Sequence, residues 1–336
     1  MGAMADPNAL RWDGAPGHYE VWYVNATDPA SGVGLWLRFT LRAALAGGGE
    51  CALWCLAMQR DGTRFARKAT FALDRLEAER APFRLRLAGA ELSDRGSAGE
   101  IGDDCAWELS WTPRLRAAPH VHPLLRRARL ARTEVVVVHP VLALSGTMRL
   151  GERALALDGA GGGQAHVWGS GHAARWAWAH ASDLRGLDGA ARPDAYVDAV
   201  SAYVRRGGRE LGPSTAVVGR VLGDDFAATS PVRVATARSR FGLTSWDFRA
   251  RDGARRLEGA VDAPRASLAG VTYHDPDGTP AYCYNSEVAS LRLVVRDRAA
   301  RGRPGWIVRD TLVADGRAHC EYGQRAPVPG VELLLP

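Results

Sequence analysis

Short segments of alternating apolar and polar residues run through almost the whole chain and constrain its fold more than any other feature. Stretches such as HYEVWYVN (18–25), GLWLRFTLRA (34–43) and CAWELSWTP (105–113) place apolar side chains at every second position, which is the period of a β-strand with one buried face. Turn-forming residues interrupt this alternation after roughly every ten to twenty residues. Segments with helical periodicity are few, so the sequence predicts an all-β protein.

A chain with so many strands must bury one face of each strand and must also protect the edges of its sheets. Antiparallel barrels and sandwiches satisfy both demands. At 336 residues, the chain is long enough for two units of about eight strands each. We therefore predict two tandem antiparallel β-barrels or sandwiches with little helix, an N-terminal domain over residues 1–168 and a C-terminal domain over residues 169–336.

Three segments between the clearest strands need an explicit interpretation. DAYVDAVSAYVRR (194–206) could begin a helix at Asp194, but its tyrosines and valines favour a strand. PVRVATARS (231–239) also fits a strand best. GAGGGQ (159–164) lacks the lysine and the strand-to-helix setting of a phosphate-binding loop, so we interpret it as part of the linker between the two domains.

Charge, hydropathy and cysteine spacing exclude several classes of protein. The net charge of +6 comes almost entirely from arginines spread along the chain, with Lys68 as the single lysine, so no dense basic stripe indicates nucleic-acid binding. No apolar run approaches the roughly 18 residues of a membrane-spanning helix, and the start of the chain does not resemble a secretion signal. Cys51 and Cys55 share a strand face, and the five cysteines form no CxxC pair, which favours buried thiols and a cytoplasmic location.

The segment GGGQAHVWGSGHAARWAWAH (161–180) concentrates three tryptophans and three histidines. If RWAWAHAS is a strand, Trp176, Trp178 and His180 point to one face and the intervening alanines to the other. The alanine face allows close packing of a second layer, whereas the tryptophan face points into a filled core or a pocket. A buried indole or imidazole N–H without a partner costs about 1–3 kcal/mol, so these side chains suit a pocket in which their donors are used.

A similar separation into two faces is expected in the N-terminal half. Glu20 and Trp22 share one face of the first strand, and Trp36 and Arg38 share one face of the next strand, away from its aliphatic residues. Aromatic walls with an occasional charged residue are typical of the interior of a ligand-binding barrel. We therefore expect indole rings from both halves to converge on a shared, unfilled apolar hollow where the two sheets meet.

Three of these segments, HYEVWYVN, AHVWG and RWAWAH, resemble motifs of the lipocalin-like superfamily that includes carotenoid 1,2-hydratases, tocopherol cyclases, AttH-type proteins and fungal lipocalin-like Diels-Alderases. Glu20, Trp22 and Tyr23 match the motif of the first strand, and residues 165–169 match an acidic motif that closes the first domain. Ala165 and Val167 occupy positions that are acidic in that motif, while His166, Trp168 and Gly169 remain.

This resemblance implies two lipocalin-like barrels in tandem with a hydrophobic ligand near their junction. It also implies an enzyme that uses no metal or redox cofactor and that supplies or withdraws a proton on a polyene or prenylated substrate. The loss of both acidic residues from AHVWG weakens a direct transfer of the hydratase mechanism, so a proton donor has to come from elsewhere in the chain.

Several ionisable residues are candidates for that proton transfer. Glu20 beside Trp22 could have the raised pKa of a general acid, or it could form an ion pair with a strand arginine such as Arg38. His166 and His180 could act as acid, base or hydrogen-bond donor, or each could be a core histidine with a satisfied hydrogen bond. Metal binding by His166, His172 and His180 matches no familiar ligand spacing. Glu287 and Glu321 are further acids, and a solvent-exposed strand face is the alternative for both.

We therefore predict a cofactor-independent enzyme that cyclises, isomerises or hydrates a hydrophobic small molecule such as a terpenoid, polyene or polyketide. The predicted catalytic residues are Glu20, His166 and His180. The predicted ligand-binding residues are Trp22, Trp36, Arg38, Trp168, Trp176, Trp178, Tyr284 and Glu287. The alternatives are a carrier that binds a lipophile without chemistry, and an inactive scaffold whose barrels are filled by their own aromatic side chains.

Overall fold

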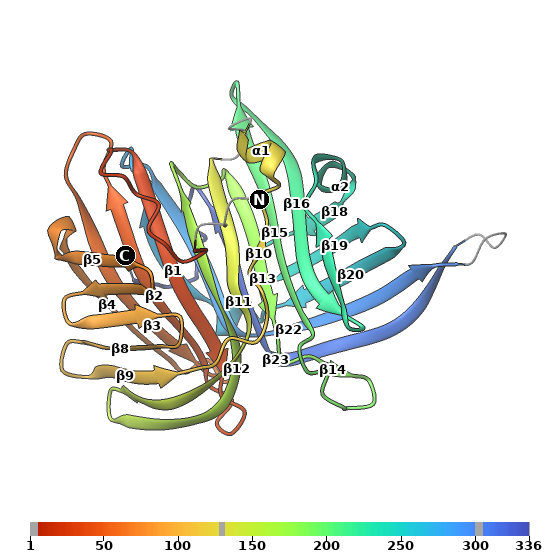
Figure 1. Ribbon diagram of the computed structural model, residues 1–336, viewed down its shortest axis with the longest axis horizontal. Helices are drawn as coiled ribbons and strands as arrows, with labels where there is room; N and C mark the ends of the chain where they lie inside the picture. The colour runs from red at the N-terminus through yellow and green to blue at the C-terminus, as the bar shows by residue number, and fades with distance from the viewer. Residues whose placement is uncertain (1–5, 128–131, 300–304, 336) are drawn as a thin grey trace.

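The computed structural model describes residues 6–127, 132–299 and 305–335, and most of their regular structure is β-strand. The strands form two large sheets that are antiparallel apart from one short parallel pair, and the first sheet curls into a nearly closed barrel (Figure 1). The predicted all-β class with little helix is confirmed. In the described ranges, no helix is long and apolar enough to cross a membrane.

The first sheet comprises all strands up to residue 169, hydrogen-bonded in the order β4-β3-β2-β1-β12-β11-β9-β8-β7-β6-β5, with β10 added beside β11. These strands are β1 (His18–Thr27), β2 (Gly34–Ala43), β3 (Gly49–Met58), β4 (Arg64–Ala72), β5 (Leu76–Arg80), β6 (Phe83–Leu87), β7 (Ala90–Ser93), β8 (Gly96–Ile101), β9 (Cys105–Ser110), β10 (Ala118–Pro119), β11 (Thr133–Leu150) and β12 (Arg153–Gly169). A 3-10 turn (Leu73–Arg75) precedes β5, and the short helix α1 (Pro123–Arg127) precedes β11.

The second sheet begins at Arg175 and has the order β17-β16-β15-β13-β23-β22-β20-β19-β18, with β14 beside β23 and with β21 and β24 extending from β22. Its strands are β13 (Arg175–Ala181), β14 (Arg185–Gly186), β15 (Tyr196–Arg206), β16 (Arg209–Val221), β17 (Asp224–Ala228), β18 (Arg238–Phe241), β19 (Ser245–Asp252), β20 (Arg255–Asp262), β21 (Ala269–His274), β22 (Pro280–Arg298), β23 (Trp306–Gln324) and β24 (Leu333–Leu335). Helix α2 (Pro231–Thr236) precedes β18, and a 3-10 turn (Arg265–Ser267) precedes β21. The sheets thus change between residues 169 and 175, and independent folding of each half stays a prediction.

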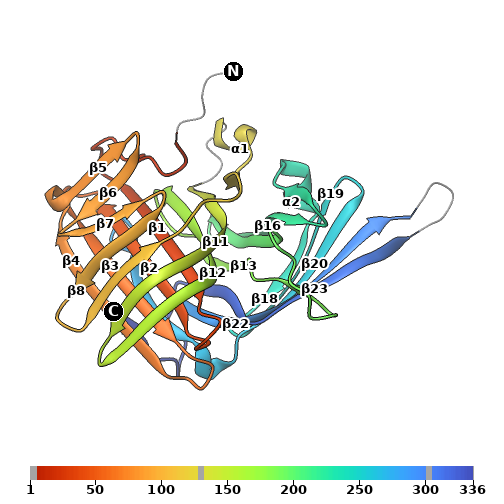
Figure 2. The same ribbon diagram turned by 60° about the horizontal axis from the view of Figure 1, so that its bottom comes forward.

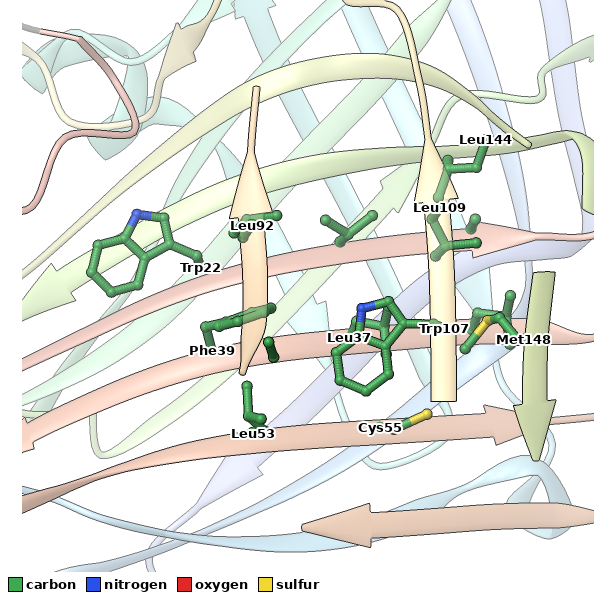
Figure 3. Close-up of a cluster of buried hydrophobic side chains, with 14 of the residues drawn as sticks. Trp22, Leu37, Phe39, Leu53, Cys55, Leu92, Trp107, Leu109, Leu144 and Met148 are labelled. Carbon is green, nitrogen blue, oxygen red and sulfur yellow. The ribbon is translucent and has the colours of Figure 1, made fainter. Parts of the chain in front are cut away.

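The interior of the first barrel is an apolar core built from alternate residues of its strands. Leu37 and Phe39 of β2 point into it, together with Trp22, Leu92, Trp107 and Met148 from other strands (Figure 3). Cys51 and Cys55 of β3 lie in the same core, as their spacing predicts. Burying a side chain as large as Phe39 contributes about 1.5–3 kcal/mol, so this core is a main source of the stability of the barrel.

The second sheet has a core of its own, which packs on the alanine face of β13. Ala177, Ala179 and Ala181 are at most 3% exposed and contact this core, as the alternation in RWAWAHAS predicts. The small alanine side chains allow the opposite layer, which includes Trp246 and Phe248, to approach β13 closely. The bulky residues of β13 consequently face the first sheet.

A third apolar cluster joins the two sheets. It includes Trp36 and Trp54 from the outer face of the first sheet, and Trp176, Tyr273 and Leu335 from the second. The hairpin of β22 and β23 contributes to two cores, because Ala281 and Cys283 lie in this third cluster while Leu291 and Leu293 lie in the core of the second sheet. The same hairpin runs from beside the first sheet out to the far end of the molecule (Figures 1 and 2).

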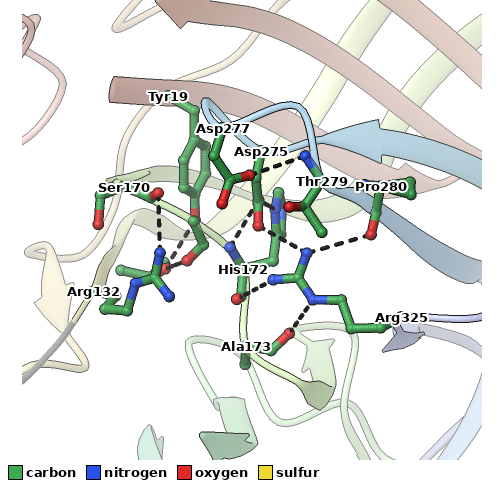
Figure 4. A network of polar contacts seen from close by, with 12 residues as sticks. Tyr19, Arg132, Ser170, His172, Ala173, Asp275, Asp277, Thr279, Pro280 and Arg325 are labelled. Atoms are coloured by element: carbon green, nitrogen blue, oxygen red, sulfur yellow. Dashed lines mark hydrogen bonds and ion pairs between the residues drawn. The ribbon is translucent and has the colours of Figure 1, made fainter. Parts of the chain in front are cut away.

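A polar network fixes the connection between the sheets (Figure 4). The backbone N–H of His172 donates to Asp275 at 2.9 Å, and the His172 ring nitrogen Nδ1 lies 2.6 Å from the same carboxylate. Arg325 pairs with Asp275 at 2.8 Å and donates to the carbonyl oxygens of His172 and Ala173. Tyr19 of β1 stacks on the His172 ring with 4.8 Å between centroids. The connection is therefore held by the end of β23 and by the turn between β21 and β22.

Two predicted elements differ from the structure. PVRVAT forms helix α2 instead of a strand, because a proline at its first turn supports a helix start after Ser230. GAGGGQ lies inside β12 instead of forming a linker. Glycine is needed in this strand, because a side chain at Gly162 would come within 1.8 Å of the carbonyl oxygen of Asn25. The strand predicted over DAYVDAVSAYVRR is confirmed as β15, which begins at Tyr196.

Candidate functional site

The two faces of the first sheet separate the predicted site residues into two groups. One group lines the end of the barrel interior and consists of Glu20, Trp22, His166 and Trp168. Tyr23 lies on the opposite face of β1, where its ring contacts the edge of Trp178 with 5.5 Å between centroids. The expectation that Trp22 and Trp168 share a hollow with Trp176 and Trp178 is therefore wrong, because the sheet itself lies between the two pairs.

Glu20 is a fully buried carboxylate that is saturated with hydrogen bonds. The backbone N–H groups of Arg11 and Trp12 donate to its two oxygens at 2.7 and 2.9 Å, and ring nitrogens of His166 and His18 lie 2.7 and 3.0 Å from them. Burial alone would raise the pKa of Glu20, but the hydrogen bonds with His166 and His18 hold this pKa at about 2. The expected raised pKa is therefore wrong, and Glu20 is ionised at neutral pH.

His166 completes the attachment of the N-terminal segment. Its Nδ1 lies 2.7 Å from the carbonyl oxygen of Pro7 and its Nε2 lies 2.7 Å from Glu20, so both ring nitrogens face oxygens that only accept. Trp22 stacks on the ring at 4.7 Å and donates to the carbonyl oxygen of Asn8 at 2.9 Å. Polar atoms of Glu20, Trp22 and His166 thus all bond to residues 7–12, and these three side chains anchor the N-terminal segment across the end of the barrel.

Arg38 belongs to the other face. It lies opposite Tyr23 in the pairing of β1 with β2, so the alternative ion pair between Arg38 and Glu20 does not form. Its guanidinium group instead lies over the ring of Tyr273 at 4.3 Å and over the ring of Trp36 at 5.2 Å. Arg38 and Trp36 thus share the face that the sequence predicts for them, and this face contacts the second sheet.

A group of buried ionisable side chains, which we call the inter-sheet polar cluster, lies between the two sheets. It consists of His120, His180, Asp198, Glu287 and His319, each at most 4% exposed. Strand pairing brings four of them together, because His180 on β13 lies directly opposite Asp198 on β15 and His319 on β23, and His319 contacts Glu287 on β22. His120 comes from the first half of the chain, immediately after β10.

Asp198 organises one side of this cluster. Its carboxylate oxygens lie 2.7 Å from His120 Nε2, 3.0 Å from His180 Nδ1 and 3.2 Å from the indole N–H of Trp178. Burial would raise the pKa of Asp198, but the hydrogen bonds with His120 and His180 lower it, so the group is ionised. The carboxylate lies beside Nδ1, so Nε2 is the ring nitrogen of His180 that faces away from Asp198. That Nε2 atom is buried without a hydrogen-bond partner among the described residues.

Glu287 and His319 form the other side, with 2.7 Å between the carboxyl Oε2 and the ring Nδ1. Burial raises the pKa of Glu287 well above its usual range, and the nearby Glu321 adds to this effect. Burial, with His180 nearby, lowers the pKa of His319 well below its usual range. Both groups are therefore neutral near pH 7 and share a proton across their contact. Glu287 Oε1 and His319 Nε2 have no hydrogen-bond partner within the described ranges.

Glycine in β12 makes room for this cluster. A methyl group on Gly163 would lie 2.6 Å from His180 Nε2, so the bare backbone of β12 passes directly over the imidazole ring. Asn25 on β1 accepts a hydrogen bond from the Gly163 N–H at 3.0 Å, yet its own Nδ2 has no hydrogen-bond partner among the described residues, and neither has Nδ2 of Asn285 on β22. Buried polar atoms without partners are rare and cost about 1–3 kcal/mol each. Their concentration here marks a place where ligand atoms or water can complete the hydrogen bonds.

The aromatic rings between the sheets pack against one another and do not surround an open hollow. Trp54 meets Trp36 and Tyr273 edge to face, with centroids 6.5 and 6.0 Å apart. A hollow of about 20 Å³, about enough for one water molecule, lies beside the alanine face of β13, where Ala177 and Cys320 meet Gly242 and Trp246 of the second sheet. A larger hollow of about 340 Å³ lies on the outside of the barrel among charged residues such as Arg86. The rings of the two halves meet as predicted, but they pack against one another, so the expected unfilled apolar space between them is wrong.

The remaining predicted residues fall on different sides of the second sheet. The indole N–H of Trp176 donates to Glu321 at 2.7 Å, and Cys283 also contacts that carboxylate, so this acid lies in the interface beside the inter-sheet polar cluster. Tyr284 is fully buried on the other face of β22, where its hydroxyl accepts from the backbone N–H of Val328. Tyr284 therefore contacts neither the cluster nor Arg38.

Sequence reasoning did not assign His120, Asp198 and His319 to the site. Prolines flank HVH (120–122) and indicate a loop rather than a site, and the partner of His120, Asp198, is 78 residues away along the chain. Asp198 and His319 could have been found from the strand alternation that singled out His180, because each lies directly opposite it in a neighbouring strand. In the described part of the chain, no group of three or more His, Cys, Asp or Glu side chains is arranged to hold a metal ion.

Comparison with known proteins places this chain among relatives without an established function. No family model matches it. Two relatives from Mycobacterium tuberculosis are each 30% identical over 318 residues, which cover 94% of this chain and 89% of theirs: the uncharacterized protein Rv0493c of strain ATCC 25618 / H37Rv and the uncharacterized protein MT0513 of strain CDC 1551 / Oshkosh.

Among solved structures, the crystal structure of a "putative AttH" from Nitrosomonas europaea is similar over 95% of this chain and 98% of its own, with a TM-score of 0.54 and 14% identity. At this identity, the likeness establishes a shared fold. The resemblance to AttH-type proteins is thus confirmed at the level of the fold, while the relation to hydratases, cyclases and Diels-Alderases stays a prediction.

Proposed function

The chain belongs to the family of the uncharacterized mycobacterial protein Rv0493c, and from that premise we propose that it is an enzyme for proton-transfer chemistry on a hydrophobic small molecule. The substrate is a terpenoid, polyene or polyketide, and the reaction is an isomerisation, cyclisation or hydration. The proposed catalytic residues are His180 and Glu287, positioned by Asp198 and His319. Glu20 and His166 are not included, because the N-terminal segment engages their polar atoms.

The observation that carries this proposal is that His180 and the pair of Glu287 and His319 lie next to each other on neighbouring strands and are buried with unpaired polar atoms. The rings of His180 and His319 have their centroids 6.4 Å apart, and Nε2 of each ring lacks a partner among the described residues. Asp198 supports His180 as a base, and burial keeps Glu287 protonated as an acid. Neighbouring titratable groups whose environments separate their pKa values are the usual basis of acid and base roles at one site.

Proton transfer between these groups and a conjugated substrate balances without a further reactant when the reaction is an isomerisation. His180 Nε2 takes a proton from a C–H next to the conjugated system, and the pair of Glu287 and His319 delivers its proton at the far end of that system. The double bonds shift by one position, and no atom is gained or lost. Return of the proton from His180 to Glu287 completes the cycle. Cyclisation uses the same two groups with carbon–carbon bond formation between the proton transfers, and hydration adds water.

Substrate entry requires the aromatic rings of the interface to separate. Tyr23 is the part of this interface that retains contact with solvent, although it is packed against the nearly buried Trp178. Displacing rings that meet edge to face costs about 0.5–1.5 kcal/mol per pair beyond their burial. An apolar substrate compensates by burying its own surface against the same rings.

A lipophile carrier is the second candidate. Buried polar atoms without a partner among the described residues, such as Glu287 Oε1 and Asn285 Nδ2, favour it, because a bound polar group would satisfy them without any reaction. In that case, the unpaired atoms of the inter-sheet polar cluster hold a polar group of the stored molecule, and no proton is transferred to carbon.

Solvent isotope exchange separates these two functions. The protein is incubated in deuterated water with farnesol, β-ionone and retinal, and deuterium in the recovered compounds is measured by mass spectrometry. The variants are Glu287→Gln, which keeps the shape and neutrality of the acid but cannot transfer its proton, and His180→Gln. Glu100→Gln is the matched control, since Glu100 is exposed on β8.

We expect deuterium incorporation or an isomerised product in the wild-type protein and in Glu100→Gln, and a rate about 100- to 10,000-fold lower in Glu287→Gln. The wild-type rate should fall as the pH rises through the raised pKa of Glu287, and this decline should be absent from the residual rate of Glu287→Gln. Tight binding of these compounds without any exchange, as followed by tryptophan fluorescence, would support the carrier instead. Full activity in both Glu287→Gln and His180→Gln would eliminate the proposed mechanism.

A further inference from the structure

Arg38 is a buried cation without a matching anion. Its side chain is on the outer face of β2 and is 8% exposed. Its Nε atom is buried without a hydrogen-bond partner, and no ion pair of Arg38 is found within residues 6–127, 132–299 and 305–335. An arginine is always charged in a protein, and a buried charge is normally paired. The unused hydrogen-bonding capacity of Arg38 therefore needs an explanation.

The surroundings of Arg38 hold its guanidinium group in a fixed position. The rings of Trp36 and Tyr273 lie 5.2 and 4.3 Å from the guanidinium carbon, and cation–π attraction at a desolvated site is worth about 2 kcal/mol. Tyr273 is itself fixed, because His172 stacks on it at 5.3 Å and Trp54 meets its edge. Stacking stabilises the plane of the cation but leaves its N–H groups available.

The hydroxyl group of Tyr273 is a second unused donor at the same place. It is buried without a hydrogen-bond partner among the described residues, and its polar neighbour is the weakly interacting thiol of Cys283. Burial raises the pKa of Tyr273 well above its usual range, so the hydroxyl keeps its proton. A cationic fork and a neutral O–H donor thus occur side by side, with no acceptor of their own.

We propose that Arg38 and Tyr273 bind the carboxylate of an elongated apolar acid, such as a polyene or fatty acid, in the interface between the two sheets. This inference rests on the proposed function, because it assigns the polar end of the molecule that the inter-sheet polar cluster acts on. The guanidinium fork of arginine matches the two oxygens of a carboxylate, and such charge-assisted hydrogen bonds are about twice as strong as neutral ones.

The charge of the interface favours a singly charged carboxylate over a phosphate. Asp198 is ionised a short distance away, and Glu321 and Glu287 also lie in the interface. One arginine balances one negative charge, whereas a dianionic phosphate would add repulsion from the ionised Asp198 without a second cation. Tyr23 lies within electrostatic range of Arg38, Asp198, Glu287 and Glu321, so it occupies the space between the proposed anion site and the polar cluster.

The strand register gives the spacing between the two ends of such a ligand. Arg38 is directly opposite Tyr23, and Asn25, which contacts Gly163 beside His180, is two residues further along β1. A strand separation of about 5 Å and a two-residue step of about 7 Å place Arg38 and Asn25 roughly 8 Å apart at the backbone. The carboxylate and the reacting carbon of the ligand are therefore separated by several bonds, which requires a chain and not a compact acid.

Matched ligands and variants test this proposal by binding alone. The ligands are retinoic acid, retinol and methyl retinoate, together with palmitic acid, hexadecanol and methyl palmitate, and the readout is quenching of tryptophan fluorescence or displacement of a bound retinoid. The variants are Arg38→Gln, Arg38→Lys and Tyr273→Phe. Arg42→Gln is the matched control, because Arg42 lies on the same face of β2 but pairs with Glu50. Circular dichroism and thermal unfolding verify that each variant is folded.

We expect the wild-type protein and Arg42→Gln to bind at least one of the two acids about tenfold or more tightly than its alcohol and its ester. Arg38→Gln should lose this preference while still binding the alcohol, Arg38→Lys should keep part of it, and Tyr273→Phe should weaken acid binding several-fold. Equal binding of acid, alcohol and ester, persistence of the preference in Arg38→Gln, or binding of none of the six compounds would overturn the proposal. Tighter binding of farnesyl phosphate than of the acids would replace the carboxylate by a phosphate and also overturn it.

The two proposals fail in different ways. If the acid preference depends on Arg38 but Glu287→Gln retains full isotope exchange, the anion site stands and the proposed catalytic mechanism fails. If exchange depends on Glu287 but acid, alcohol and ester are turned over and bound equally well, the mechanism stands and the anion site fails.

Discussion

Replacing Glu20 by glutamine removes the charge that holds the N-terminal segment across the barrel end while keeping the size of the side chain. The folded protein lowers the pKa of this carboxyl from 4.5 to about 2, despite its burial, through hydrogen bonds with His166 and His18. At 1.36 kcal/mol for each pH unit, this corresponds to about 3 kcal/mol of stability. Because the pKa is lower in the folded state, the stabilisation is fully present above pH 4.5 and is lost as the pH falls through 2.

The assay is urea unfolding of the wild-type protein and of Glu20→Gln at a series of pH values from 7 down to 2.5, followed by tryptophan fluorescence. We expect the variant to be less stable by about 3 kcal/mol at pH 7, since a buried imidazole then loses its charged partner. The difference should shrink below pH 4.5, because the unfolded wild-type chain then takes up a proton at this carboxyl while the folded protein keeps it ionised down to about pH 2. Limited proteolysis should cut the variant within residues 6–12 sooner than the wild-type protein, because Arg11 and Trp12 lose a charged acceptor.

The exposed Glu100→Gln serves as the control and should show neither effect. A stability difference between Glu20→Gln and the wild-type protein that stays constant from pH 7 to pH 2.5 would refute the assignment of the stabilisation to the charge. A difference below about 1 kcal/mol at pH 7 would refute the anchoring role itself, because that is the size expected for an ordinary neutral hydrogen bond.

Other substitutions test the packing between and within the sheets. Gly163→Ala places a methyl group 2.6 Å from His180 Nε2, so we expect the free energy of unfolding to fall by about 1–3 kcal/mol. Gly242→Ala is the control, because no atom lies within 4 Å of the added carbon, and it should leave the urea midpoint unchanged. Ala179→Leu should lower the free energy of unfolding by a similar amount, about 1–3 kcal/mol, because it overpacks the core of the second sheet. The folded variant should bind ligands as tightly as the wild-type protein does if the alanine face of β13 lies away from the ligand. A thiol reagent should label the native protein slowly, because the five cysteines are buried and burial raises the pKa of Cys51 to about 12. All five should react in urea, and fast labelling of the native protein would contradict this.

Much of the fold could be predicted from local alternation because the pleat of a strand repeats every two residues. The pattern assigned Trp36 and Arg38 to one face and the alanines of β13 to the other side of their strand, and both assignments are confirmed. Strict alternation would place Val288 on the face opposite Cys283, but a bulge between Ser286 and Ala289 places both residues in the third apolar cluster. A single extra residue reverses the faces of the rest of a strand, and nothing in the local composition reveals its position.

The candidate site was harder to predict because its contacts join distant parts of the chain. His180 could be singled out from its own strand, but its environment depends on Asp198, His319 and Gly163, which belong to three other strands. The glycine run of β12 resembles a flexible linker in the sequence. Its need for glycine depends on contacts with other strands, since a side chain at Gly162 would meet Asn25 of β1 and one at Gly163 would meet His180 of the second sheet. Glu20 shows the same difficulty, since its four hydrogen-bond donors include two backbone groups of a segment without regular structure.

The last strands of the chain cover an apolar face that belongs to the first barrel. Trp36 and Trp54 are shielded largely by residues of β21, β22 and β24, which are synthesised after almost everything else. During translation, the emerging barrel therefore presents this face uncovered until the C-terminal hairpin leaves the ribosome, and it is exposed to aggregation or to chaperone capture throughout that interval. A premature stop anywhere before residue 269 would thus yield a sticky fragment, and not a smaller working barrel.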